Sequence, residues 1–130
     1  MKILIVEDDR NKRLFLEYFL KEKNIEFYSF SSVRPAISYS IKCSSEIDGI
    51  ILALGLTSYD YSDDYDFTKG LELIKELTKK RISIPILINS STYVDLDSLM
   101  KMHSNIKAQM DDDEFHLRQF VNSLIKGSGI

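Results

Sequence analysis

Three consecutive acidic residues, Glu7, Asp8 and Asp9, follow a short apolar run near the start of the chain. Carboxylate oxygens are the ligands that Mg²⁺ prefers, and one or two carboxylates suffice because the ion keeps several waters. Acidic residues are also favourable at the N-terminus of any helix, where they cap free N–H groups and oppose the helix dipole. The pattern therefore leaves two interpretations open, a site for Mg²⁺ or the N-cap of the first helix.

Short apolar runs and helix-like segments alternate along the whole chain. Continuous runs rich in Ile, Leu and Val are typical of strands that helices cover on both faces. Three clear runs and two weaker ones predict five strands, at residues 3–6, 26–30, 50–54, 84–88 and 106–110. Helical spacing of apolar residues predicts five helices, at about 11–23, 33–45, 70–80, 94–103 and 113–126.

Strand–helix alternation of this length predicts a doubly wound α/β domain, a five-stranded parallel sheet with helices on both faces. Ligands bind such sheets beyond the carboxyl ends of the strands. The residues just after each strand are therefore the candidates for a site, and they include Glu7 to Asp9, Ala53 to Leu56, and Ser90 with Ser91. No Gly-rich phosphate loop follows the first strand, which argues against a nucleotide enzyme.

The composition excludes several classes of protein. The chain has 130 residues, is 44% hydrophobic and carries a formal net charge of −3. Nucleic-acid binders need basic residues to neutralise phosphates, so direct contact with nucleic acid is not expected. One cysteine, Cys43, cannot form an internal disulfide, and two histidines, His103 and His116, which we expect at the surface, cannot build a zinc site with it unaided. No apolar run is long enough to span a membrane, and we expect a cytoplasmic protein.

Three segments together resemble the receiver domains of bacterial response regulators. KILIVEDD at residues 2–9 resembles the opening of that family, KGLELIKEL at 69–77 its third helix, and IPILINSS at 84–91 its fourth strand. The resemblance covers essentially the whole chain in order. It implies a flavodoxin-like, CheY-like sheet with strand order 2-1-3-4-5 and a role in two-component signal transduction.

Receivers of this family accept a phosphoryl group on an aspartate at the end of the third strand, with the help of Mg²⁺. Carried over residue by residue, the family's acidic pair falls on Glu7 and Asp8, which match, and its hydroxyl falls on Ser90, which also matches. The acceptor position falls on Ala53 and the lysine position on or near Met110, and neither matches. The family's aromatic switch position falls near Lys107 and does not match either.

Ala53 argues against standard aspartyl phosphorylation because a methyl group offers no nucleophilic oxygen. No carboxylate lies between Asp48 and Asp60 that a shifted alignment could use instead. No cofactor is then required, and binding of Mg²⁺ by Glu7 and Asp8 is expected to be weak without a third carboxylate. Ser90 would contact backbone near the pocket or, as the simpler interpretation, be a surface hydroxyl after a strand.

The sequence therefore predicts a signalling module that is not an enzyme and that binds protein partners. The resemblance implies that partner binding and homodimerisation use the fourth helix, the fifth strand and the fifth helix. Two alternatives stay open: an unorthodox receiver phosphorylated on an aspartate of a loop, and a small Mg²⁺-dependent phosphotransfer enzyme that uses Asp8 and Ser90.

One segment is longer than the family's usual connection. We expect one domain over residues 1–126, with an inserted loop at about 57–69 and a flexible C-terminal end at 127–130. The insertion is rich in aspartate, tyrosine and phenylalanine. Long loops are often functional, and here a lid over the pocket, a docking strip, a mobile tether or a plain solvated loop all fit the composition.

Overall fold

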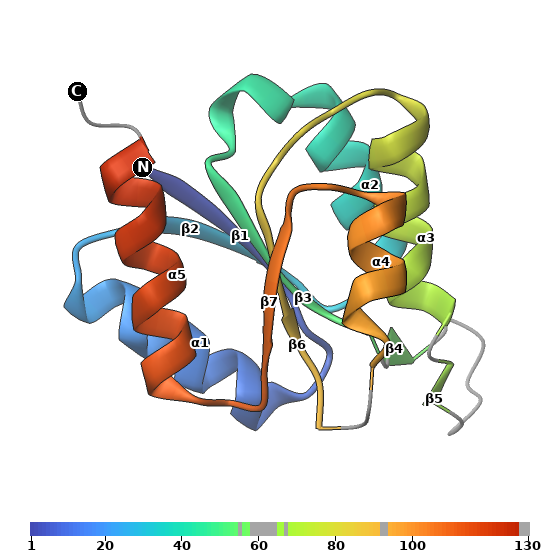
Figure 1. Cartoon of the computed structure of the whole chain (residues 1–130). Coiled ribbons are helices and arrows are strands. Elements are labelled where there is room, and N and C mark those ends of the chain that lie inside the picture. Colours follow the sequence, from blue (N-terminus) through green and yellow to red (C-terminus); the bar gives the residue numbers. More distant parts are fainter. Residues whose placement is uncertain (55, 58–64, 67, 92–93, 128–130) are drawn as a thin grey trace.

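The five predicted strands form one parallel sheet in the computed structural model of the chain (Figure 1). Their order across the sheet is β2-β1-β3-β6-β7, which is 2-1-3-4-5 for the five predicted strands, and the predicted fold is confirmed. Their bounds are β1 (Lys2–Val6), β2 (Glu26–Phe30), β3 (Gly49–Ala53), β6 (Ile86–Asn89) and β7 (Ile106–Met110). Pro85 precedes β6, and its carbonyl still accepts from the Ile50 amide at 2.9 Å. The structure describes residues 1–54, 56–57, 65–66, 68–91 and 94–127.

Helices cover both faces of the sheet, with α1 and α5 on one face and α2, α3 and α4 on the other (Figure 1). Their bounds are α1 (Arg10–Glu22), α2 (Val33–Lys42), α3 (Thr68–Lys79), α4 (Leu96–Met102) and α5 (Glu114–Gly127). The second predicted helix ends at Lys42, and a 3-10 turn at Ser44–Glu46 covers the rest of the predicted range.

Alternate strand residues supply the two halves of the core. Ile3 and Ile5 of β1 pack toward α1 and α5, whereas Leu4 and Val6 pack toward α2, α3 and α4. All four side chains are at most 1% exposed. This two-sided burial explains why the strands are continuous apolar runs, since a strand covered on both faces has no polar side.

The inserted segment contains two short strands that the sequence did not predict. β4 (Leu56–Thr57) and β5 (Tyr65–Asp66) pair in antiparallel fashion, with Leu56 opposite Asp66. Residues 58–64, which include Asp60, Asp63 and Asp64, lie outside the described part of the chain. The structure therefore does not test whether this loop is a lid, a docking strip or a tether. The same holds for residues 128–130 at the C-terminal end.

His103 is buried, so its expected place at the surface is wrong. Only 6% of the residue is exposed, and its Nδ1 lies 3.1 Å from the Thr78 hydroxyl. Its Nε2 lies 3.5 Å from the Ile84 carbonyl. The histidine therefore links α3, the start of β6 and the end of α4. His116 is partly exposed, as expected.

None of the described helices combines the length and the apolar character that a membrane-spanning helix needs.

Candidate functional site

The carboxyl ends of β1, β3, β6 and β7 meet at one edge of the sheet. The strand register sets Ala53 of β3 beside Asn89 of β6, and Asn89 beside Met110 of β7. Val6 of β1 lies beside Leu52, so Glu7 follows directly next to the end of β3. The structure therefore brings together the acidic, acceptor, hydroxyl and lysine positions that the sequence separates by up to about a hundred residues.

Glu7 is the most buried acid of the site. Only 3% of the residue is exposed, and its Oε2 accepts from the Asp9 amide at 3.2 Å. Arg13 donates to the Glu7 carbonyl at 3.1 Å, which fixes the backbone rather than the carboxylate. Burial, with a smaller contribution from the neighbouring Asp8 carboxylate, raises the pKa of Glu7 from 4.5 to about 7 against the lowering effects of the Asp9 amide and Lys12. Glu7 therefore carries a proton over much of the range in which an exposed glutamate is ionised.

The two interpretations of the acidic run apply to different residues. Asp9 is the N-cap of α1, and its Oδ1 accepts from the Lys12 amide at 3.1 Å. Glu7 instead lies in the interior at the end of β1, and Asp8 is partly buried between them. The N-cap interpretation is correct for Asp9 alone, and the first two acids remain as candidates for a site.

These residues do not fit a tightly held Mg²⁺ ion. A metal ligand has to be deprotonated, and the raised pKa of Glu7 means that an ion would compete with a proton there. Among the described residues, no group of three or more His, Cys, Asp or Glu side chains converges to hold a metal. Glu7 and Asp8 could contribute two oxygens, and this supports only the weak binding expected from the sequence.

Ala53 occupies the end of β3, where the receiver family carries its acceptor. The residue is 5% exposed and belongs to the core beneath α2, α3 and α4. Helix α3 closes over this point: a Cβ atom on Gly70 would lie 2.6 Å from the Ala53 carbonyl oxygen and 2.6 Å from Leu54 Cα. The Gly70 amide donates to the Leu54 carbonyl at 3.2 Å. The absence of a side chain on Gly70 therefore permits the close approach of α3 to the end of β3.

Met110 occupies the end of β7, where the family's lysine position falls. It is 3% exposed and packs against the core beneath α1 and α5. A thioether has no N–H to donate to a phosphoryl oxygen and carries no charge. Lys107, at the family's aromatic switch position, is exposed on β7. The three positions that depart from the family pattern therefore lie on the two strands where that pattern expects them.

Ser90 is buried, so its interpretation as a surface hydroxyl is wrong. Only 8% of the residue is exposed. Its amide donates to the Met110 carbonyl at 2.9 Å, and its carbonyl accepts from Gln109 Nε2 at 3.2 Å. These bonds continue the β6–β7 pairing beyond the end of β6, which buries the serine between the two strand ends.

Asn89 and Asp112 form a pair at the site that the sequence did not predict. Asn89 Nδ2 donates to Asp112 Oδ1 at 2.9 Å, and the Asp112 amide donates back to Asn89 Oδ1 at 2.9 Å. Asp112 has a positive φ of 47°, a conformation that aspartate tolerates better than most residues. Lys12 of α1 lies 3.9 Å from Asp112 Oδ2. Three elements therefore meet here: α1, β6 and the turn between β7 and α5.

Asn89→Ala is expected to lower the free energy of unfolding by about 2 kcal/mol. The change removes two hydrogen bonds and leaves the Asp112 amide without its acceptor, and an unsatisfied buried group costs about 1–3 kcal/mol. Chemical denaturation monitored by circular dichroism measures this difference. Asn89→Asp is the matched variant and should destabilise as well, because it places a carboxylate against Asp112. Equal stability of Asn89→Ala and the wild type would mean that this pair does not hold the turn.

Neither a protein-family model nor a curated protein sequence matches this chain. Solved structures do resemble it over nearly its full length. A signal receiver domain from Vibrio parahaemolyticus superposes with a TM-score of 0.77 at 18% identity, covering 97% of this chain and 90% of that one. The chain has the receiver-domain fold.

Two further receiver structures superpose on nearly the whole of this chain, at slightly higher sequence identity. The receiver domain of the Francisella response regulator 1452 has a TM-score of 0.71 and 21% identity, covering 98% of both chains. The response regulator TrrA from Thermotoga maritima, solved in complex with Mg²⁺ and beryllofluoride, has a TM-score of 0.72 and 21% identity over 95% of this chain and 97% of that one. At these identities, the similarity establishes the receiver fold and leaves function to be argued from the site.

Proposed function

We propose that this chain is a receiver-type signalling module that acts by binding proteins and that is neither an enzyme nor phosphorylated at Ala53. The receiver fold supports the signalling role, since its structural neighbours are receiver domains. One observation carries the second half of the proposal: the residue at the end of β3 is an alanine. A phosphoryl transfer at this position needs an attacking oxygen, and a methyl group has none.

The surroundings of Ala53 agree with the loss of phosphoryl chemistry. A phosphoryl group on β3 needs cationic partners because its oxygens carry developing negative charge. The position beside Asn89 on β7 is the uncharged Met110. Lys12, the nearby lysine of α1, pairs with Asp112 at 3.9 Å. Because the lysine of α1 is paired with an aspartate of the chain and Met110 carries no charge, this arrangement supports a pocket without a free cation among the described residues for a transferred phosphoryl group.

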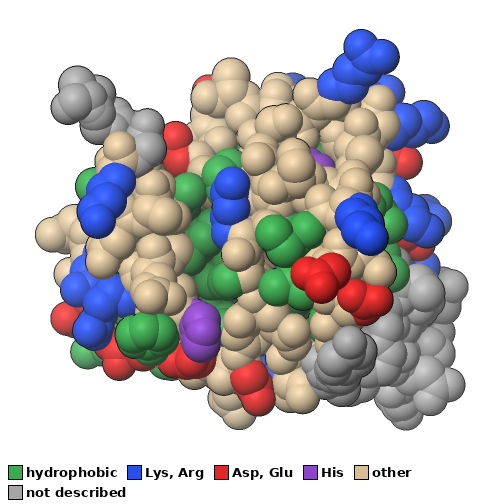
Figure 2. All heavy atoms as spheres, viewed as in Figure 1, with side chains coloured by type: hydrophobic (Ala, Val, Ile, Leu, Met, Phe, Trp, Pro, Cys, Tyr) green, Lys and Arg blue, Asp and Glu red, His purple; other side chains and the backbone are tan. Residues whose placement is uncertain are grey.

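A binding role requires a surface for a partner. Figure 2 shows hydrophobic side chains in the region between α5 and α4, on the face where β7 is the edge strand. Among the described residues, Met100 of α4 is 39% exposed and Phe115 of α5 is 62% exposed. We propose this face, formed by α4, β7 and α5, as the surface for partner binding and for a homodimer.

Two other functions are weaker. Phosphorylation of a loop aspartate would use residues such as Asp60, Asp63 and Asp64, which lie outside the described part of the chain. A Mg²⁺-dependent phosphotransfer enzyme using Asp8 and Ser90 would need a firmly held Mg²⁺ ion, and the raised pKa of the adjacent Glu7 makes a proton compete with the ion there. No structural observation favours either function over binding.

Incubation with acetyl phosphate and Mg²⁺, followed by intact-mass spectrometry, tests the proposal. We expect no mass increase corresponding to a phosphoryl group, under conditions that label a receiver domain with an aspartate at the end of its third strand, run alongside as the positive control. A labelled protein whose phosphopeptide maps to residues 57–69 would support the loop alternative and overturn this part of the proposal. Release of inorganic phosphate at a rate that Ser90→Ala abolishes would support the enzyme alternative.

A further inference from the structure

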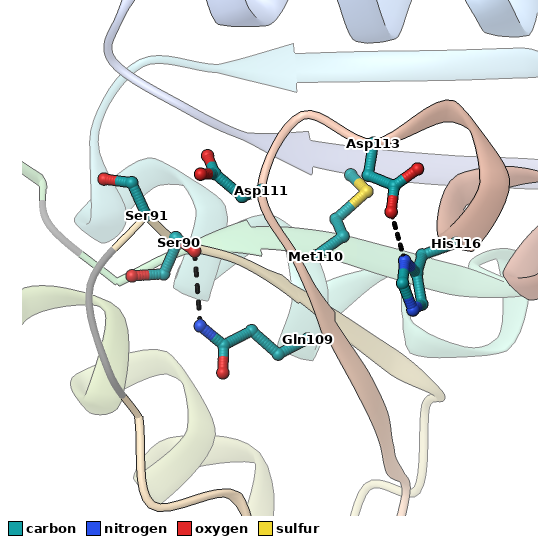
Figure 3. Close-up of a pocket in the computed structure, with 7 residues that line it drawn as sticks. All are labelled: Ser90, Ser91, Gln109, Met110, Asp111, Asp113 and His116. Atoms are coloured by element: carbon teal, nitrogen blue, oxygen red, sulfur yellow. Dashed lines mark hydrogen bonds and ion pairs between the residues drawn. The ribbon is translucent and has the colours of Figure 1, made fainter.

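A cavity of about 490 Å³ lies beside the site, between the end of β6, the end of β7 and the first turn of α5 (Figure 3). Its volume falls within the usual range of ligand-binding pockets, about 300–1,000 Å³. Seven residues line it: Ser90, Ser91, Gln109, Met110, Asp111, Asp113 and His116. In Figure 3 the two serines lie at one end, Asp113 and His116 lie at the other, and Met110 lies between them.

The charge in this cavity comes from an alternating pattern in the acidic run at residues 111–114. Asp111 and Asp113 line the cavity, whereas Asp112 and Glu114 do not. The chain neutralises the second pair itself: Lys12 lies 3.9 Å from Asp112, and Arg118 lies 3.1 Å from Glu114. Acidic side chains also gather along this end of the face in Figure 2.

Among the described residues no lysine or arginine pairs with Asp111 or Asp113, and the partner of Asp113 is His116. Neither residue type lines the cavity, and Asp111 makes no ion pair within the part of the chain that the structure describes. Asp113 is held in place, since its Oδ1 accepts from the Phe115 amide at 2.8 Å and its Oδ2 bonds to His116 Nδ1. The bond from His116 and that from the Phe115 amide lower the pKa of Asp113, which keeps the carboxylate ionised at neutral pH.

We propose that this cavity receives an arginine side chain of a protein partner. The proposal rests on the binding role proposed above and names the chemistry of the partner. Two carboxylates, of which Asp113 is bonded to His116 and Asp111 has no ion pair among the described residues, favour a positive group and disfavour a phosphate or an acidic peptide. Ser90 and Gln109, on the same side of the cavity as Asp111 in Figure 3, add polar acceptors, and Met110 adds an apolar wall. A guanidinium group offers five donors in a planar fork and a weakly hydrated face that packs on apolar atoms, so it matches this lining better than an ammonium group.

Binding at this place would reach the strand ends directly. Gln109 bonds to the Ser90 carbonyl at 3.2 Å, and the Ser90 amide bonds to the Met110 carbonyl at 2.9 Å. An arginine that contacts Gln109 therefore acts on the same link between β6 and β7 that borders Ala53 and Asn89. A partner could in this way act on the strand ends beside Ala53 by changing the hydrogen bonds between β6 and β7, and no phosphoryl group would be needed.

Amide NMR on the ¹⁵N-labelled full chain tests the proposal with a defined probe, the blocked peptide acetyl-Gly-Arg-Gly-amide. We expect saturable shifts at residues 90, 91, 109, 111 and 116, with a dissociation constant on the order of 1 mM for so small a ligand. The same peptide with citrulline in place of arginine has nearly the same shape without the charge, and it should not saturate these signals.

Matched variants separate the cavity from the general acidity of this surface. Asp111→Asn should raise the dissociation constant about twofold to fivefold, the change expected for an exposed charge pair. Glu114→Gln removes the same charge from the same segment outside the cavity and should leave it unchanged. The proposal is wrong if the citrulline peptide binds as well as the arginine peptide, if both variants weaken binding equally, or if no shift saturates. Such a failure leaves the phosphorylation result untouched, because this titration contains neither a phosphoryl donor nor Mg²⁺.

Discussion

Ala53→Asp is expected to destabilise the protein by about 3 kcal/mol at pH 7.5 and to leave it unlabelled by acetyl phosphate. The new carboxylate would enter a position that is 5% exposed, beside the end of β1 with its buried acid Glu7. A buried charge without a partner costs about 3–5 kcal/mol. Labelling should fail because Met110 offers no cation to the phosphoryl oxygens. Urea denaturation and intact-mass spectrometry measure the two effects.

Adding Met110→Lys to this variant should recover part of the lost stability and permit labelling. The two positions lie on either side of Asn89, on the strands β3 and β7 that flank β6, so the new charges are about two strand spacings, roughly 10 Å, apart. We expect a favourable coupling of about 1–2 kcal/mol in a double-mutant cycle. Ala53→Asn provides the uncharged control, since it adds similar volume without a carboxylate. Efficient labelling of Ala53→Asp alone would show that another cation serves the site and that Met110 does not occupy the lysine position.

Glu7→Gln should stabilise the protein at alkaline pH and have little effect in acid. Burial raises the pKa of Glu7 in the folded protein to about 7, compared with 4.5 for an ordinary glutamate. The folded state therefore binds the proton more tightly than the unfolded chain does. The stability that this proton contributes is complete below about pH 4.5 and is lost as the pH rises through about 7.

In the variant Glu7→Gln, the side-chain oxygen can still accept from the backbone amide of Asp9, and the side chain cannot ionise. We therefore expect the advantage of Glu7→Gln over the wild type to grow from near zero at pH 4.5 to about 2–3 kcal/mol at pH 8.5. Thermal unfolding at several pH values measures this difference. Glu22→Gln, on the exposed end of α1, is the control and should show no such trend. A constant difference across the pH range would mean that Glu7 is ionised in the folded protein throughout.

The apolar runs of the sequence were sufficient to predict the sheet and its helices. Residues 3–6 and 50–53 are buried on both faces, so every position in them is apolar and each strand is visible as a continuous run. The two-residue strands β4 and β5 were missed because a ladder of this length has no periodicity to detect. The end of the second helix was missed as well, since a 3-10 turn at Ser44–Glu46 follows it almost directly and continues the helical direction of the chain.

The sequence predicted those site residues whose role follows from their place at the end of a strand. Ala53, Glu7 and Ser90 follow strands, and the carboxyl ends of parallel strands meet at one edge. The pair of Asn89 and Asp112 joins residues 23 positions apart and depends on a left-handed turn, which the sequence does not mark. The one available signal was an amide at the last position of an otherwise apolar strand. The burial of Ser90 and His103 likewise follows from which neighbours cover them.

Titration with beryllofluoride and Mg²⁺, followed by amide NMR, tests most directly whether this site has lost its phosphoryl chemistry. Beryllofluoride binds where a phosphoryl group would be held, and the TrrA structure contains it together with Mg²⁺. The TrrA regulator therefore serves as the positive control. We expect no saturable shift at Glu7, Asp8, Ala53 or Ser90 of this chain at concentrations that saturate the control. Saturable shifts at these residues would contradict the account, because they would show that the site still holds a phosphoryl analogue.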